Sequence, residues 1–130
     1  MTSISNIFGA SAKIFLQYDG DIEVLADTLS KGLLIPDFYF KSDQDPPHEL
    51  QGLCETLGYE IWLTYTKEYP GFAFELMIET ELQLEESFNH QFYNISPWFA
   101  RHVSTVCHLI SCTVNIDGKI LYFKNGEIYS

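Results

Sequence analysis

The residues most able to do chemistry in this sequence are carboxylates. Five glutamates occur within twelve residues, with no lysine or arginine between positions 69 and 99: Glu75, Glu79, Glu81, Glu85 and Glu86. Like charges this close repel, so the cluster carries a cost in folding stability. It is explained either by a solvated strand face that resists edge pairing or by a surface that meets a basic partner. We predict that the glutamates form a surface that meets a basic partner.

Aromatic residues lie close to these glutamates in the sequence and would serve the same surface. Tyr69 precedes the cluster, while Phe92 and Tyr93 follow it. Aromatic side chains are enriched among the residues that anchor protein–protein interfaces. We therefore predict a partner-binding site made of the five glutamates with Tyr69, Phe92 and Tyr93.

Two carboxylates can also perform acid–base catalysis, which keeps a small hydrolase or transferase as the alternative function. Glu60 and Glu75 lie in apolar strand patterns, where a raised pKa is expected. However, 18 acidic residues in 130 bring carboxylates together by chance. We expect binding rather than catalysis, and an acidic adaptor of another cytoplasmic complex remains a third option.

The histidines and cysteines do not form a recognisable metal or catalytic motif. His102 and His108 are six residues apart on a predicted helix, at about 100° per residue, and therefore point apart. The spacing of Cys107 and Cys112 does not match structural zinc sites. Cys54 and Cys107 fall on apolar stripes and are expected in the core. The glycines form no phosphate-binding motif, so we predict neither a metal nor a cofactor.

Composition narrows the class of protein further. The chain has 130 residues, 18 acidic against 7 basic, a net charge of −11 and 46% hydrophobic residues. This charge disfavours binding to nucleic acids and to anionic membranes, while the apolar content supports a folded core. The N-terminus lacks the pattern of a secretory signal, and no apolar run reaches the roughly 20 residues of a membrane span. We expect one cytoplasmic domain, residues 1–130, of undetermined oligomeric state.

Hydrophobic periodicity predicts the elements that would position the glutamates. Helical spacing of apolar residues predicts three helices: residues 22–29 ended by Gly32, residues 50–57 ended by Gly58, and residues 96–110 opened by Ser96-Pro97. Strands are predicted at 12–18, 38–41, 59–66 and 72–82, with C-terminal hairpins around Asp117-Gly118 and Asn125-Gly126.

These elements predict an α+β (mixed α/β) domain: a mainly antiparallel sheet with about three helices packed on it. The strands 59–66 and 72–82 should form a hairpin across the turn Tyr69-Pro70-Gly71. In the second strand, glutamates alternate with apolar residues. One face would then carry Glu75, Glu79 and Glu81, and the other would carry Phe72, Phe74, Leu76, Ile78 and Leu82.

Taken together, the chain resembles bacterial immunity proteins of contact-dependent growth inhibition and other polymorphic toxin systems. The resemblance lies in its small acidic, aromatic-rich character and in two stretches, Ile22–Leu29 before Gly32 and Tyr59–Tyr65 before the glutamate-bearing strand. It implies a cytoplasmic antitoxin that binds its cognate toxin domain, often a nuclease with a basic groove. It would neutralise that toxin by stoichiometric inhibition.

Overall fold

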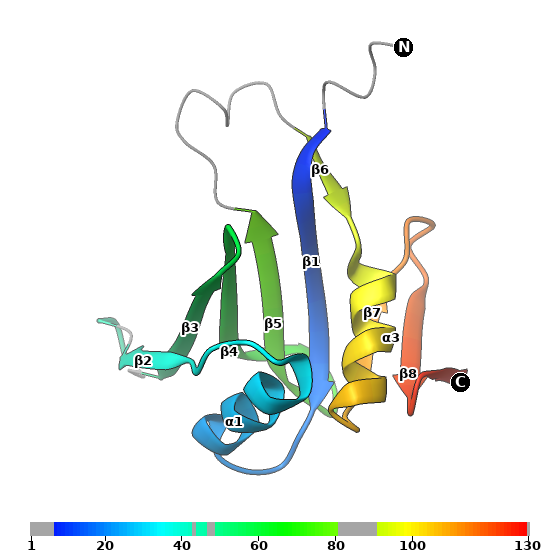
Figure 1. Cartoon of the computed structure of the whole chain (residues 1–130). Coiled ribbons are helices and arrows are strands. Elements are labelled where there is room, and N and C mark those ends of the chain that lie inside the picture. The colour runs from blue at the N-terminus through cyan, green and yellow to red at the C-terminus, as the bar shows by residue number, and fades with distance from the viewer. Residues whose placement is uncertain (1–6, 43, 47–48, 81–90, 130) are drawn as a thin grey trace.

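One large sheet organises the chain, with helices packed against it (Figure 1). The computed structural model describes residues 7–42, 44–46, 49–80 and 91–129. Within these ranges the elements are, in chain order, β1 (Ile7–Gln17), α1 (Ile22–Leu33), β2 (Tyr39–Ser42), β3 (Leu50–Thr56), β4 (Tyr59–Tyr69), β5 (Phe72–Thr80), β6 (Gln91–Asn94), α3 (Ser96–Val106), β7 (Ile110–Val114), β8 (Ile120–Lys124) and β9 (Glu127–Tyr129).

The sheet is antiparallel in all but one of its described pairings, with strand order β2-β3-β4-β5-β1-β7-β8-β9. The exception involves β1, the long central strand. One edge of β1 pairs with β5, while the other pairs first with β6, in parallel, and then with β7. The predicted α+β class, the mainly antiparallel sheet and the hairpin of β4 and β5 are confirmed.

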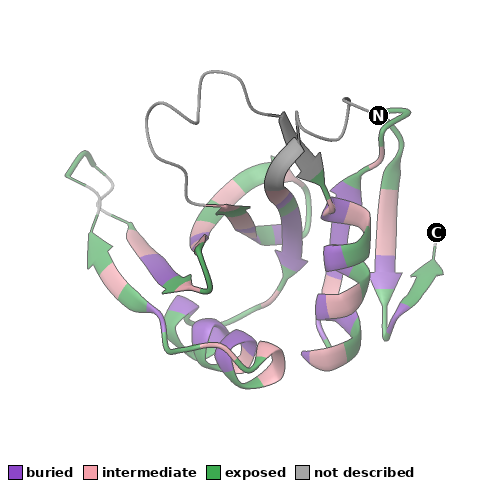
Figure 2. Cartoon of the chain, turned by 45° about the horizontal axis from the view of Figure 1, so that its top comes forward, coloured by how far each residue is buried: buried purple, intermediate pink, exposed green. Residues whose placement is uncertain are grey.

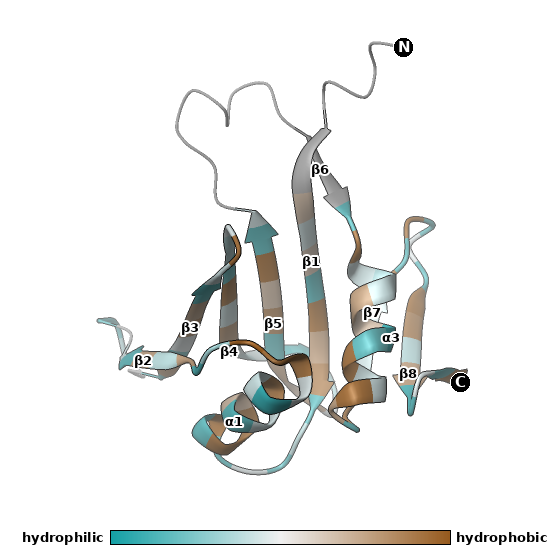
Figure 3. Ribbon diagram, in the orientation of Figure 1, coloured by the Kyte–Doolittle hydropathy of each residue, from teal (hydrophilic) through white to brown (hydrophobic). Residues whose placement is uncertain are grey.

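Both helices lie on one side of the sheet and cover its apolar face (Figure 1). Leu63, Leu76 and Ile14 stand directly opposite one another on β4, β5 and β1, and all three are fully buried. Leu25 and Leu29 of α1 belong to the same core. Burial alternates along β5 from Phe74 to Met77, the strand carries both hydrophobic and hydrophilic residues (Figure 3), and buried positions occur in both helices and the central strands (Figure 2). This alternation is typical of a sheet with one covered face.

The predicted helix at residues 50–57 is wrong, because this segment forms strand β3 and a turn. Leu53 and Cys54 point to opposite faces of the sheet, yet both are buried. A strand buried on both faces lacks simple alternation, so its apolar residues fell by chance on helical spacing. Leu57 is 92% exposed and, with Gly58, has a positive φ in the tight turn to β4. The described residues therefore contain two helices instead of the three predicted.

Two of the predicted helix ends are also wrong. Helix α1 continues through Gly32, and Leu34 adopts the left-handed conformation that ends it, with its N–H donating to the carbonyl of Ser30. Helix α3 ends at Val106, so Ile110, predicted on its apolar face, begins β7. Gly32 has a different role. A Cβ on it would lie 2.5 Å from Sγ of Cys107, and glycine therefore permits the close approach of α1 and the end of α3.

Replacing Gly32 with alanine is expected to destabilise the protein. The added methyl group must displace the Cys107 thiol, at a cost of about 1–3 kcal/mol that the better helical preference of alanine offsets by about 1 kcal/mol. Urea unfolding would measure the difference. The penalty should shrink when Cys107 is also alanine, because the clashing sulfur is gone. Equal penalties in both backgrounds would show that the contact is not responsible.

The cysteines are free thiols within the fold, as predicted for core residues. Cys54, Cys107 and Cys112 are all buried and unpaired by disulfides. Burial raises the pKa of Cys107 and of Cys112 to about 11, so these thiols are protonated at neutral pH. Because the thiolate is the nucleophile, this burial disfavours thiol chemistry at these two positions.

A second, smaller core lies apart from the main one. Phe15, Phe72 and Cys112 form it, and Tyr69 and Tyr122 pack against it. Phe72 was expected to share the main apolar face with Phe74, so that part of the prediction is wrong. The pairing register of β4 and β5 shifts between Tyr65 and Tyr69. Beyond this irregularity, at the turn end of the hairpin, side chains no longer follow the alternation of faces seen in the rest of the two strands.

Candidate functional site

Three glutamates form a row across the sheet on the face opposite the helices. Glu55 of β3 stands directly opposite Glu60 of β4, and Glu60 stands directly opposite Glu79 of β5. Their faces follow from the register, because Leu63, Leu76 and Cys54 of the same strands point to the helix side. We call Glu55, Glu60 and Glu79 the acidic row.

The acidic row places like charges at the closest cross-strand positions of a sheet. Opposed residues have Cβ atoms roughly 4.5–5.5 Å apart, where like charges destabilise the pairing. Tyr39 of β2 borders the row, and its hydroxyl donates a 2.8 Å hydrogen bond to Oε1 of Glu55. That bond, with the charges of Glu55 and Glu60, raises the pKa of Tyr39. Among the described residues, no lysine or arginine forms an ion pair with Glu60 or Glu79.

An apolar strip runs beside the acidic row on the same face. Leu53, Trp62 and Met77 stand opposite one another on β3, β4 and β5, one pleat away from the glutamates. Trp62 and Met77 are half-buried, and the ammonium of Lys41 lies 5.0 Å from the Trp62 ring. An acidic row next to an accessible tryptophan combines long-range charge attraction with the kind of side chain that anchors interfaces.

Neutralising the middle glutamate is expected to stabilise the isolated protein. Glu60→Gln relieves two opposed like-charge pairs and should raise the unfolding free energy by about 0.5–1 kcal/mol at low salt. Glu79→Gln relieves one such pair and is the matched control, with about half the gain. Urea unfolding at low and high salt would measure both effects. A loss of stability in Glu60→Gln would mean that the row is not repulsive.

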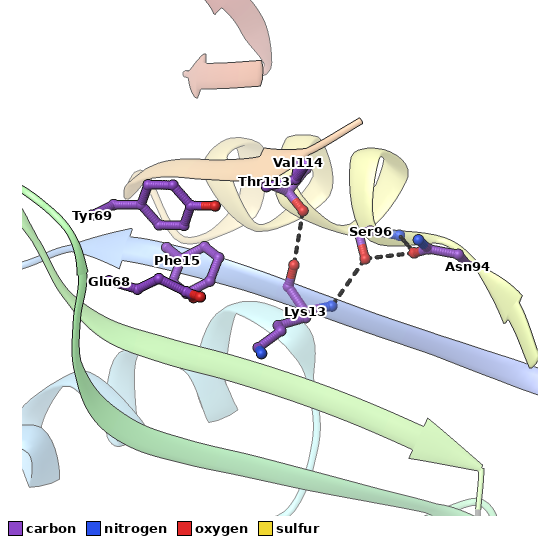
Figure 4. A pocket seen from close by; sticks show the side chains of 8 residues that line it. All are labelled: Lys13, Phe15, Glu68, Tyr69, Asn94, Ser96, Thr113 and Val114. Atoms are coloured by element: carbon purple, nitrogen blue, oxygen red, sulfur yellow. Dashed lines mark hydrogen bonds between the residues drawn. The ribbon is translucent and has the colours of Figure 1, made fainter. Parts of the chain in front are cut away.

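A second feature of this face is a pocket where β1 exchanges β6 for β7, which we call the fork pocket (Figure 4). It has a volume of about 270 Å³, and its lining includes Lys13, Phe15, Glu68, Tyr69, Thr113 and Val114. Tyr69 was predicted as a site residue. Its ring meets that of Phe15 edge-on, with centroids 4.6 Å apart.

Hydrogen bonds between elements join several residues that line the fork pocket. The backbone N–H of Lys13 donates to Oγ of Ser96 at 2.9 Å, and Oγ of Ser96 donates to Oδ1 of Asn94 at 2.6 Å. Oγ1 of Thr113 donates to the carbonyl of Lys13 at 2.8 Å. These side chains replace the ladder bonds that β1 loses where it changes partner. The side chains of Asn94, Ser96 and Thr113 are therefore already engaged with the fold (Figure 4).

Glu75 is a mostly buried carboxylate next to two residues that line the fork pocket, Phe15 and Lys13. It stands opposite Phe15, its side chain is 21% exposed, and its Oε1 is 3.9 Å from Nζ of Lys13. Burial raises the pKa of Glu75, Lys13 opposes that shift, and the charge of Glu68 adds to it. The raised pKa expected from the apolar setting of Glu75 is thus confirmed.

The ionised form of Glu75 should make stability depend on pH. A carboxyl whose pKa is higher in the folded than in the unfolded protein costs no stability below the unfolded pKa, and its cost grows as pH rises through the folded pKa. Glu75→Gln should therefore gain stability relative to the wild type between acidic and neutral pH. Urea unfolding at a series of pH values, with the exposed helix variant Glu23→Gln as control, would measure the gain. An equal pH profile in Glu75→Gln and wild type would contradict the assignment.

The structure brings together part of the predicted partner-binding site. Glu75 and Glu79 share the face opposite the main core, as predicted. Glu81, Glu85 and Glu86 lie outside the described residues, and so do the side chains of Phe92 and Tyr93 in β6. Sequence reasoning missed Glu55 and Glu68 as site residues and considered Glu60 for its pKa alone. No turn signal in the sequence pointed to the pairing of Glu55 with Glu60, because Leu57-Gly58 lacks the asparagine, aspartate or glycine typical of the first position of a two-residue hairpin turn.

The remaining chemistry-bearing residues lie elsewhere. On the helix side, Trp98 is 60% exposed and stacks on His102, with ring centroids 5.0 Å apart. The part of the chain that the structure describes brings no three potential metal ligands together. Neither described helix is long and apolar enough to cross a membrane. Comparisons with protein-family models, curated proteins and solved structures gave no match to this chain.

Proposed function

We propose that this protein is a binding protein of the immunity type, which neutralises a basic toxin domain by occupying it in a one-to-one complex. The observation that carries the proposal is the acidic row, three glutamates in direct register on the sheet face opposite both helices. The row opposes folding stability, so its presence is best explained by a use outside the fold. The net charge of −11 means that the whole molecule, and not the acidic row alone, attracts a basic partner.

The proposed partner follows from charge and chemistry. A nuclease must hold phosphates in a basic groove, and an acidic surface of similar dimensions competes for that groove. Long-range attraction would speed the encounter, and burial of Trp62 and Met77 would slow dissociation. No bond is made or broken in this inhibition. The cognate nuclease toxin domain of a contact-dependent growth inhibition system would be such a partner.

The experiment that tests the proposal is co-expression with the product of the neighbouring upstream gene. We expect a one-to-one complex on size-exclusion chromatography, lower affinity as salt is raised, and growth of cells that the neighbour alone arrests. A neighbour that is harmless and is not retained by the protein would overturn the immunity role.

A carboxylate-pair hydrolase or transferase is the second candidate, favoured by one observation. Glu75, with its raised pKa, and Glu68 interact through their charges beside the fork pocket. A catalytic acid is expected to have such a pKa. This candidate predicts that Glu75→Gln abolishes turnover of a substrate while the protein stays folded, whereas the binding proposal requires no turnover.

A further inference from the structure

The fork pocket offers chemistry that the fold itself does not use. Two side chains of the lining, Ser96 and Thr113, are hydrogen-bonded to the backbone of β1, and Asn94 accepts a hydrogen bond from Ser96. The charged groups around the pocket are different. Glu68 and Lys13 line the pocket. Glu75 lies just outside the lining, interacts with the charge of Glu68, and is 3.9 Å from the ammonium of Lys13, at the outer limit of an ion pair.

The walls of the pocket favour a flat cation. The half-buried ring of Tyr69 lines the pocket and packs edge-on against Phe15, which is only 3% exposed, and Figure 4 shows the side chain of Glu68 beside Phe15. A guanidinium group stacks on aromatic rings and donates paired hydrogen bonds to carboxylates, which an ammonium group cannot do in the same way. Aromatic and carboxylate groups side by side are therefore better suited to arginine than to lysine.

The size of the pocket limits the occupant to something small. Its volume of about 270 Å³ is just below the roughly 300–1,000 Å³ typical of small-molecule sites. One side chain fits this space more readily than a substrate or a cofactor does. The side chain of Lys13 is 54% exposed, so it can turn out to solvent and leave Glu75 to a stronger partner.

We propose that the fork pocket receives a single arginine side chain of the basic partner, which displaces Lys13 and pairs with Glu68 and Glu75. This inference rests on the proposed function and names the anchor of that interface. Arginine is among the residues most enriched at interface hot spots, and a bound arginine would fix the register of the acidic row on the partner. Glu68 and Glu75 act here as binding residues, and Lys13 acts as an internal competitor.

The test uses the full-length protein and a defined probe, N-acetyl-arginine methylamide, titrated by NMR. The citrulline analogue has nearly the same shape without the charge and is the matched probe control. We expect the arginine probe to shift resonances of Tyr69 and Phe15 and to bind several-fold more weakly to Glu68→Gln and Glu75→Gln. It should bind more tightly to Lys13→Met, which keeps the backbone hydrogen bonds of that residue. Glu23→Gln, on the far side of the sheet, should leave binding unchanged.

Each contrary result overturns the inference. Equal shifts with the citrulline probe would mean that charge is not recognised. Tighter binding to Glu75→Gln and weaker binding to Lys13→Met would mark an anion site, and turnover of a substrate that Glu75→Gln abolishes would mark an enzyme. The proposed function fails separately, when no basic protein is retained although the probe behaves as expected.

Discussion

Reversing the charge of the acidic row is expected to slow association with the proposed toxin domain by about 10- to 1,000-fold at low salt, the range over which electrostatic steering acts. The variant carries Glu55→Lys, Glu60→Lys and Glu79→Lys together. Because all three charges change sign, the row remains a row of like charges, and its internal repulsion is nearly preserved. The change therefore alters the external field far more than the fold. Stopped-flow association at several salt concentrations would measure it.

A control with the same change in net charge separates the row from the molecule's overall charge. Glu23→Lys, Asp37→Lys and Glu127→Lys alter exposed positions away from the row. If the row contacts the partner, its reversal should slow association much more than the control and reduce the dependence on salt. Equal slowing would assign the attraction to net charge alone and would move the interface elsewhere. Urea unfolding of both variants would confirm that each is folded.

The elements that sequence periodicity predicts well are those with one exposed face. Helix α1, residues 61–65 of β4 and residues 74–78 of β5 each show an apolar repeat, because solvent meets one side of each. β3 fails this condition, since Leu53 and Cys54 are both buried on opposite faces. The spacing of the apolar residues in β3 could not by itself distinguish a strand from a buried helix. Gly32 was misread for a related reason, because close packing against Cys107 depends on tertiary structure.

The types of residue in the candidate site could be predicted from the sequence, but their arrangement on the sheet could not. Alternation along β5 correctly put Glu75 and Glu79 on one face. The two glutamates nevertheless belong to different surface features, and this division depends on how the strands are paired. Glu79 joins Glu60 and Glu55 across the sheet, whereas Glu75 belongs with Lys13 and the fork pocket. A register is set by pairing between strands and is not contained in the pattern of one strand. Once β3 was assigned as a helix, the acidic row could not be found.

Truncating the opposite face of the same strand should have the largest effect on stability. Leu76→Ala is expected to lower the unfolding free energy by about 3–5 kcal/mol, the range for a fully buried leucine whose surroundings cannot collapse. Leu76 is fully buried between Leu63 and Ile14, two side chains that are themselves held by neighbouring strands. Domains of this size have unfolding free energies of about 5–15 kcal/mol, so the substitution would remove a large part of the total stability.

The matched variant on β5 is Glu79→Ala, three residues along the strand and on the other face. It truncates an exposed side chain and relieves one like-charge pair, so urea unfolding should find it within about 0.5 kcal/mol of the wild type. In a complex with the proposed partner the order of effects should invert. Leu76→Ala, where it is folded, should bind with unchanged affinity, while Glu79→Ala should associate more slowly. Should Leu76→Ala cost less than about 1 kcal/mol, the division of β5 into a folding face and a binding face would be wrong.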